Sequence, residues 1–196
     1  MTDYFALLQF PRAPWLEAAT VNDRFLELSR PVHPDHVHNL PPEQLAAANK
    51  AFSDLNLAAA TLRESKERVQ HLLELETGAA SQATQNIPAE LIDLFAKIGQ
   101  SCRAIDQFLA ERARASSPIL QAQLFAQGLD WTDRLTALQQ EVASLKERAE
   151  QELQRIASAW PESKPIDDLR ALAHRFAMIA RWESQLKERF ATLAIA

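Results

Sequence analysis

The sequence predicts an all-α protein in which a small N-terminal domain precedes a helical bundle. The chain has 196 residues but only 3 glycines, and it is rich in alanine, leucine, glutamate, glutamine and arginine, which favour helices. Apolar residues recur at spacings of three, four and seven over long stretches, as in amphipathic helices. The 10 prolines mark the breaks between these stretches, because proline ends a helix.

The first 30 residues predict two short helices. Residues 3–10 form an apolar segment that Asp3 is placed to cap. Residues 16–30 repeat apolar side chains at helical spacing, and Pro31 and Pro34 prevent this helix from continuing. We therefore expect the stretch that follows to be an exposed loop.

A long helix is expected next, starting at Pro41 and Pro42 and continuing to residue 75. Residues 76–87 are small and polar, which indicates a linker. The sequence thus predicts a first domain over 1–75, a linker over 76–87 and a second domain over 88–196.

The second domain is expected to be an antiparallel three-helix bundle with an extra short helical piece. Pro88 opens its first helix, residues 115–119 break it, and the extra piece follows that break. A near-heptad helix comes next, and the two prolines of residues 161–165 form a turn before the last helix. A dimeric coiled coil is the alternative for the near-heptad run, but a chain that turns back on itself favours the bundle.

Composition limits the function. The formal net charge is −5, whereas proteins that bind nucleic acid or anionic membranes carry clustered positive charge. Cys102 is the only cysteine, so neither an internal disulfide nor a thiolate zinc site is expected. Glycine-rich phosphate loops are absent, and we expect no cofactor. No apolar run is long enough for a membrane span and no signal peptide is evident, so a cytoplasmic location is expected.

Residues 30–38 read RPVHPDHVH and hold three of the five histidines. Pro34 fixes its own φ angle and stiffens the stretch, so His33 and Asp35 would be displayed to a partner. Metal binding would need several of these side chains to converge, which Pro34 restricts. A metal-dependent enzyme is therefore the least favoured hypothesis, and we expect the protein not to be an enzyme.

A short helix, a longer helix, the tripeptide HPD and a long helix resemble the J domain of DnaJ-like co-chaperones. Further residues at matching positions resemble HscB, the co-chaperone of iron–sulfur cluster assembly. They are Asp3, Tyr4, Phe5, Leu8, Arg24, Phe25 and Leu28 before HPD, and Glu43, Gln44, Leu45, Asn56, Thr61, Leu62, Arg63, Arg68, Leu72 and Leu73 after it. A J domain followed by a three-helix domain is also similar to the HscB arrangement.

This resemblance implies that the J domain docks on a DnaK- or HscA-type chaperone and stimulates its ATPase. The residues implied in that contact are His33, Pro34, Asp35, Arg24 and Arg30. Many J domains have a basic second helix, whereas residues 16–30 here are net negative by one, so electrostatic steering is expected to be weak.

The resemblance also implies that the second domain carries a client, the scaffold protein on which iron–sulfur clusters are built. The implied client-binding residues are Leu91, Ile92, Leu94, Phe95 and Phe176. Two alternatives remain open. One is a J-domain co-chaperone for a different client, and the other is a helical interaction module that activates no chaperone.

Overall fold

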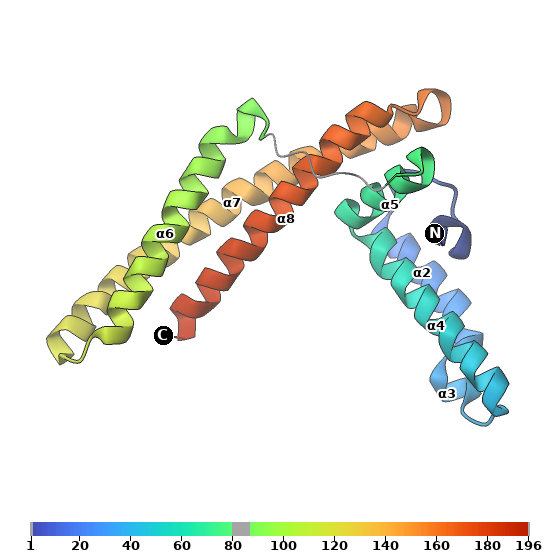
Figure 1. Ribbon diagram of the computed structural model, residues 1–196, viewed down its shortest axis with the longest axis horizontal. Helices are drawn as coiled ribbons and strands as arrows, with labels where there is room; N and C mark the ends of the chain where they lie inside the picture. The colour runs from blue at the N-terminus through green and yellow to red at the C-terminus, as the bar shows by residue number, and fades with distance from the viewer. Residues whose placement is uncertain (1, 80–86, 196) are drawn as a thin grey trace. The chain divides into compact units, whose positions relative to one another are not determined.

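The computed structural model describes residues 2–79 and 87–195, and all regular structure in these ranges is helical (Figure 1). The all-α prediction is confirmed. Contacts divide the chain into two compact units, one formed by Met1–Gln82 with Glu150–His174 and the other by Ala83–Ala149 with Arg175–Ala196. None of the described helices combines the length and the apolarity that a bilayer span requires.

In the first unit, α1 (Tyr4–Leu7) begins at Asp3, whose carboxylate accepts a hydrogen bond from the Ala6 backbone N–H at 3.1 Å. This side-chain cap satisfies an N–H that the helix itself leaves unpaired. α2 (Ala18–Ser29) then packs beside α4 (Pro42–Arg63) (Figure 1). Their contact surface forms a core with α1 and α5, and its largest buried apolar side chains are Phe5, Leu8, Val21, Leu55, Leu62, Leu72 and Leu73.

The prediction of a single long helix up to residue 75 is wrong, because the helix is interrupted at Glu64. This residue is extended (φ −89°, ψ 120°) and separates α4 from α5 (Ser65–Thr77). Arg68, only 1% exposed, places its guanidinium at the break. It donates hydrogen bonds to the carbonyl oxygens of Leu62 at 2.7 Å and Pro14 at 2.8 Å. The buried cation thus replaces helical hydrogen bonds that α4 loses at its end.

Part of the expected linker is also helical. Glu76 and Thr77 form the last turn of α5, and Gly78 ends the helix with a left-handed φ of 70°. Glycine suits this position because a side chain would be strained there. Residues 80–86 of the expected linker lie outside the described residues.

The second unit is built from η2 (Ala89–Leu91), α6 (Ile92–Arg114), and the parts of α7 (Pro118–Ser163) and α8 (Ile166–Ile195) that fall within it (Figure 1). The extra helical piece expected after residue 119 is the first part of α7. Pro161 lies inside the last turn of α7, so the turn before α8 contains only Lys164 and Pro165.

The near-heptad residues of α7 are buried within a single chain, as the bundle requires. They are Leu135, Leu138, Val142, Leu145 and Ala149 in the second unit, and Leu153 and Ile156 in the part of α7 that belongs to the first unit. On α6, Cys102 is also buried, and burial raises the pKa of its thiol. An ion pair joins α8 to α6 at the surface of the second unit, where Arg189 Nη2 lies 2.7 Å from Asp106 Oδ2.

Candidate functional site

The HPD stretch joins α2 to α4 and is folded rather than extended. Residues Arg30–Val32 form a 3₁₀ turn, η1, and Pro34–Val37 form a one-turn helix, α3. Pro34 is the first residue of α3, where its missing N–H would have no helical partner in any case. His33 precedes it as the N-cap residue. The expectation of an exposed loop is therefore wrong in part: the side chain of Asp35 is exposed, but Pro34 starts a helical turn.

The imidazole of His33 is held from two sides. Its Nδ1 atom accepts a hydrogen bond from the Asp35 backbone N–H at 3.2 Å. Its ring meets the ring of Phe52 on α4 edge to face, with centroids 5.1 Å apart, an arrangement that aromatic rings favour. Phe52 in turn lies 6.3 Å from Phe25 on α2. Both helices of the pair therefore support this histidine.

Asp35 is presented to solvent on this rigid turn. Its side chain is 86% exposed, and one carboxylate oxygen lies 3.6 Å from His33 Nδ1. The Asp35 backbone oxygen lies 2.9 Å from His38 Nδ1, and Val37 is buried beneath the turn. An exposed carboxylate on a fixed backbone can receive a cation or a hydrogen-bond donor with little loss of conformational entropy.

The two arginines expected at the chaperone contact lie on α2 and η1. Arg24 Nη1 forms an ion pair with Glu27 Oε2 at 2.9 Å, and Arg30 is exposed. Among the described residues, neither is hydrogen-bonded or paired with His33 or Asp35. The guanidinium groups and the HPD turn are thus independent features of this end of the α2–α4 pair.

The five residues expected at the client site divide between core and surface. Phe176 is 2% exposed and Leu91 is buried, so both belong to the interior of the second unit. Ile92 and Phe95 are 50% and 48% exposed, and Leu94 is half-buried. Only the start of α6 therefore offers an accessible apolar surface from this set.

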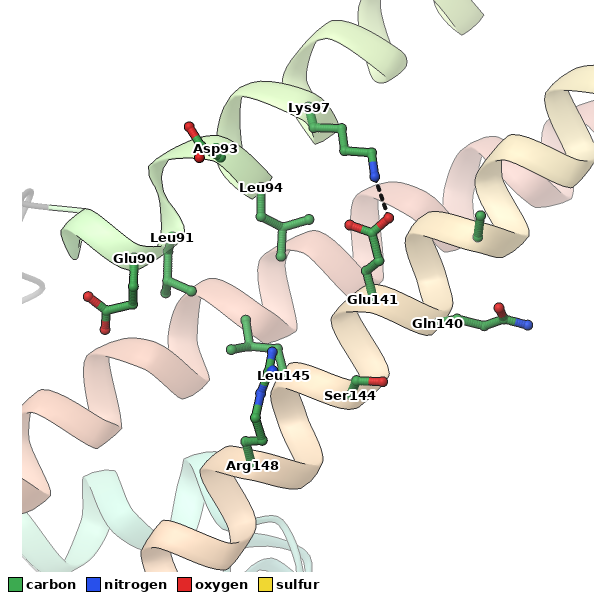
Figure 2. Close-up of a pocket in the computed structure, with 11 residues that line it drawn as sticks. Glu90, Leu91, Asp93, Leu94, Lys97, Gln140, Glu141, Ser144, Leu145 and Arg148 are labelled. Atoms are coloured by element: carbon green, nitrogen blue, oxygen red, sulfur yellow. Dashed lines mark hydrogen bonds and ion pairs between the residues drawn. The ribbon is translucent and has the colours of Figure 1, made fainter.

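A groove with a volume of about 750 Å³ lies between the start of α6 and the middle of α7 (Figure 2). Leu94 and Leu145 contribute apolar lining, while Asp93 and Arg148 add charge of both signs. The contributions of α7 to this groove were not expected from the sequence. The sequence feature that could have indicated them is the set of charged and polar residues between the near-heptad positions of α7. One of these residues, Glu141, pairs with Lys97 across the groove (Figure 2).

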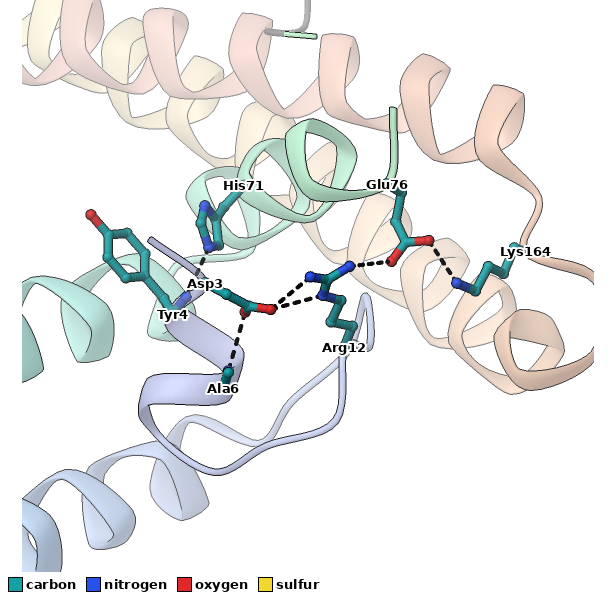
Figure 3. Close-up of polar contacts among 7 residues, drawn as sticks. All are labelled: Asp3, Tyr4, Ala6, Arg12, His71, Glu76 and Lys164. Atoms are coloured by element: carbon teal, nitrogen blue, oxygen red, sulfur yellow. Dashed lines mark hydrogen bonds and ion pairs between the residues drawn. The ribbon is translucent and has the colours of Figure 1, made fainter. Parts of the chain in front are cut away.

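A chain of ion pairs lies elsewhere in the first unit (Figure 3). Arg12 Nη2 lies 2.8 Å from Asp3 Oδ2, and Arg12 Nη1 lies 3.4 Å from Glu76 Oε1. Lys164 Nζ, in the turn between α7 and α8, lies 2.6 Å from Glu76 Oε2. The hydrogen bond from Lys164 is the main cause that lowers the pKa of Glu76. The N-terminal segment, the end of α5 and the turn between α7 and α8 meet here.

His71 supports the start of α1 in the same region (Figure 3). Its Nε2 atom accepts a hydrogen bond from the Tyr4 backbone N–H at 3.1 Å, and its ring stacks on the Tyr4 ring at 4.5 Å. Burial lowers the pKa of His71, so the neutral ring, which can accept this hydrogen bond, is favoured.

The histidines of residues 33–38 form no cluster of metal ligands. Within residues 2–79 and 87–195, no group of at least three histidine, cysteine, aspartate or glutamate side chains could hold a metal ion. The described geometry of the HPD turn consists of hydrogen bonds and ring contacts.

Comparisons with solved structures show that this fold is similar to that of HscB from two organisms. HscB from Vibrio cholerae matches over 95% of this chain and 96% of its own, with a TM-score of 0.56 and 17% identity. Human HscB matches over 97% of this chain and 81% of its own, with a TM-score of 0.58 and 21% identity. Identities this low establish the fold alone.

By sequence, part of the chain is similar to HscB co-chaperones. It is 31% identical to the HscB homolog of Shewanella baltica over 85 residues, which is 43% of this chain and 49% of that protein. It is 26% identical to the homolog of Haemophilus ducreyi over 91 residues, 46% of this chain and 53% of that one. The chain thus spans about half the length of the curated relatives it matches. No family model matches it.

Proposed function

We propose that the protein is an HscB-type co-chaperone that stimulates the ATPase of a DnaK- or HscA-type chaperone through its HPD turn. The observation that carries this proposal is the fixed turn, in which His33 is held by Phe52 and the Asp35 carboxylate is 86% exposed. Such a group can bind an arginine of one conformational state of the chaperone better than of another. This difference in affinity is what biases a two-state partner. The protein itself performs no chemistry.

Single-turnover ATP hydrolysis by the chaperone tests the proposal. The wild-type chain accelerates hydrolysis, and Asp35→Asn abolishes the acceleration because it removes the charge but keeps the shape. Asp168→Asn is the matched control, since it changes an exposed aspartate on α8, away from the HPD turn. Equal stimulation by wild type and Asp35→Asn would contradict a role for this carboxylate.

We propose in addition that Arg24 and Arg30 flank the docked chaperone, with a modest contribution. Arg24 is already paired with Glu27, so the free charge on this side is small and long-range steering is weak. Replacing both arginines by glutamine is expected to slow association and to make it less sensitive to salt. The maximal stimulation at saturating co-chaperone should change little.

For the client, we propose that the scaffold protein of iron–sulfur cluster assembly docks on Ile92 and Phe95 at the start of α6. This pair supplies exposed apolar area, and the mixed charges of the adjoining groove supply polar contacts. Phe176 and Leu91 support the surface from the core. Calorimetry with the scaffold is expected to show binding that Phe95→Gln weakens and that Leu57→Gln, an exposed leucine on α4, leaves unchanged.

A different client is the second candidate. The observation that favours it is the Lys97–Glu141 pair, which places a cation beside the exposed apolar residues at the start of α6. Stimulation that depends on Asp35 but does not respond to the scaffold would support this candidate.

A further inference from the structure

One nitrogen atom of His33 lies near two groups of Asp35 that need it in opposite protonation states. His33 Nδ1 accepts a hydrogen bond from the Asp35 backbone N–H at 3.2 Å. The same Nδ1 lies 3.6 Å from Oδ2 of the Asp35 carboxylate. A backbone N–H only donates and a carboxylate only accepts. Nδ1 therefore binds the N–H when it carries no proton and the carboxylate when it carries one.

The neutral ring gives the arrangement that the structure shows. His33 is the N-cap residue of α3, and its Nδ1 is the side-chain acceptor that caps this short helix. Because Nδ1 accepts, the proton of the neutral imidazole is on Nε2. Within residues 2–79 and 87–195, no lysine or arginine pairs with the Asp35 carboxylate, which stays available to a partner.

Protonation of the ring reverses both contacts. An imidazolium donates from both nitrogens and cannot accept, so α3 loses its cap. Nδ1–H then faces the Asp35 carboxylate and forms an ion pair with it. The side chain of His33 is 41% exposed, so solvent can deliver the proton, and the ring changes its partner without disturbing a core.

We propose that His33 is a proton-controlled switch of the HPD turn: the neutral ring leaves the Asp35 carboxylate free for the chaperone, and the protonated ring binds this carboxylate itself. The inference rests on the proposed function, in which Asp35 meets a cation of the chaperone. An imidazolium on the same turn competes with that cation. The lost cap also loosens the turn, which raises the entropy cost of docking. Docking therefore weakens as the surroundings become acidic.

Other charged and titratable groups surround the ring. They are Asp23, Arg24 and Glu27 on α2, Arg30 on η1, His36 and His38 in the HPD turn, and Lys50 and Asp54 on α4. Two of the cations are held in ion pairs, at 2.9 Å between Arg24 and Glu27 and at 2.6 Å between Lys50 and Asp54.

The two neighbouring histidines make different contacts. The His36 ring meets the His33 ring edge to face, with centroids 6.0 Å apart. His38 Nδ1 lies 2.9 Å from the backbone oxygen of Asp35. Among the described residues, the ion-pair partner of the Asp35 carboxylate is His33.

Nuclear magnetic resonance of the isotope-labelled full chain tests the switch without the chaperone. The pH is lowered from about 8 to about 5.5, a range in which histidines take up a proton. We expect the signals of the Asp35 amide and of its carboxyl carbon to change in step with the ring nitrogens of His33. Asp35 signals that do not follow the protonation of His33 overturn the proposal.

His33→Asn is the control variant in this measurement. Asparagine also caps helices but does not titrate, so both Asp35 signals should change much less over the same pH range. An unchanged response of these signals in His33→Asn would assign the effect to another group and would overturn the proposal.

Chaperone stimulation tests the consequence for docking. The affinity follows from the concentration of the full chain that gives half-maximal stimulation, with each rate divided by the chaperone's own rate at the same pH. We expect the affinity to fall about three- to tenfold from about pH 8 to about pH 5.5. Circular dichroism verifies that the chain stays folded. His36→Gln and His38→Gln should keep this pH dependence, and its disappearance in either variant overturns the proposal.

The two measurements separate a failure of the switch from a failure of the proposed function. Stimulation that depends on Asp35 but has the same affinity at about pH 8 and about pH 5.5 overturns the switch and leaves the proposed function intact. A chain that gives no stimulation even at about pH 8, where histidines are mostly neutral, overturns the proposed function and the control of docking with it.

Discussion

The Nη1 atom of Arg68 lies 2.7 Å from the carbonyl oxygen of Leu62, where α4 ends. The same guanidinium donates to Pro14 through Nε, so one buried cation joins the N-terminal segment to the break between two helices. Burial lowers the pKa of Arg68 to about 10, which leaves it charged near neutral pH. A planar group with several donors suits carbonyls that face it from different directions.

Arg68→Lys is expected to destabilise the protein by about 2–4 kcal/mol, because an ammonium group cannot reach all these acceptors and buried carbonyls are left unpaired. Urea unfolding followed by circular dichroism measures the loss. Arg103→Lys, at an exposed position of α6, is the control and should change stability by less than about 0.5 kcal/mol. Equal effects of the two substitutions would contradict the structural role of Arg68.

The His71–Tyr4 contact makes stability depend on pH. Because the pKa of His71 is lowered in the folded protein, the unfolded chain takes up a proton first as pH falls. The stabilisation is complete above about pH 6.5, the unfolded pKa, and is lost as pH falls from there through the lower folded pKa. His71→Gln keeps an acceptor near the Tyr4 N–H but does not titrate, so thermal unfolding of this variant should vary less between pH 7 and pH 5. Identical slopes in the two proteins would refute this linkage.

The Arg12–Glu76–Lys164 chain is expected to give a salt-dependent stabilisation. Glu76→Gln should lower the free energy of unfolding by about 1 kcal/mol at low ionic strength, because the carboxylate bridges two cations. The difference from wild type should shrink at ~1 M salt, where exposed ion pairs are screened. Glu147→Gln, at an exposed position of α7, provides the control.

Acid acts on the same carboxylate. The pKa of Glu76 is lowered in the folded protein, so its contribution is present above about pH 4.5, the value of an unperturbed glutamate, and is lost as pH falls below it. Acid unfolding monitored by tryptophan fluorescence measures this contribution. We expect the stability of Glu76→Gln to fall less than that of wild type below about pH 4.5, because the variant has no carboxylate to protonate at this position. Any pH dependence that remains in the variant comes from other carboxylates.

Phe52 should matter for chaperone stimulation more than for folding. Phe52→Leu keeps an apolar side chain on α4 but removes the ring against which His33 packs. We expect stimulation of the chaperone ATPase to fall about 3–10-fold, since a less ordered turn loses entropy on docking. The unfolding midpoint should move only slightly, because Phe52 is half-buried. Full stimulation by this variant would mean that the ring contact does not position the turn.

Residue patterns predicted the parts of this fold that depend on local interactions. The cap formed by Asp3, the end of α2 before Pro31 and the break before Pro118 were all expected from side chains close in sequence. The break at Glu64 was not, because it is stabilised by a hydrogen bond between Arg68 and Pro14, which are 54 residues apart. The helical spacing of apolar residues continues across Glu64, so the sequence pattern does not indicate that the helix is interrupted there.

The candidate client site illustrates the same limit. The resemblance implied that Leu91, Ile92 and Phe95 bind the client, but the spacing of apolar residues does not say which of them α7 and α8 cover. Phe176 has the spacing of a core residue and is one. The helical turn at Pro34 was not predicted either, although proline is common at the first position of a helix.

The reactivity of the Cys102 thiol can serve as a probe of how often the second unit opens. A buried thiol with a raised pKa reacts slowly with alkylating reagents. It becomes reactive only when α6 separates from its neighbours, so the rate of modification reports how often the bundle opens. Because Cys102 is the only cysteine of the chain, the rate of thiol modification can be measured without an engineered label. Docking of a client on α6 should then slow the modification of this single sulfur atom.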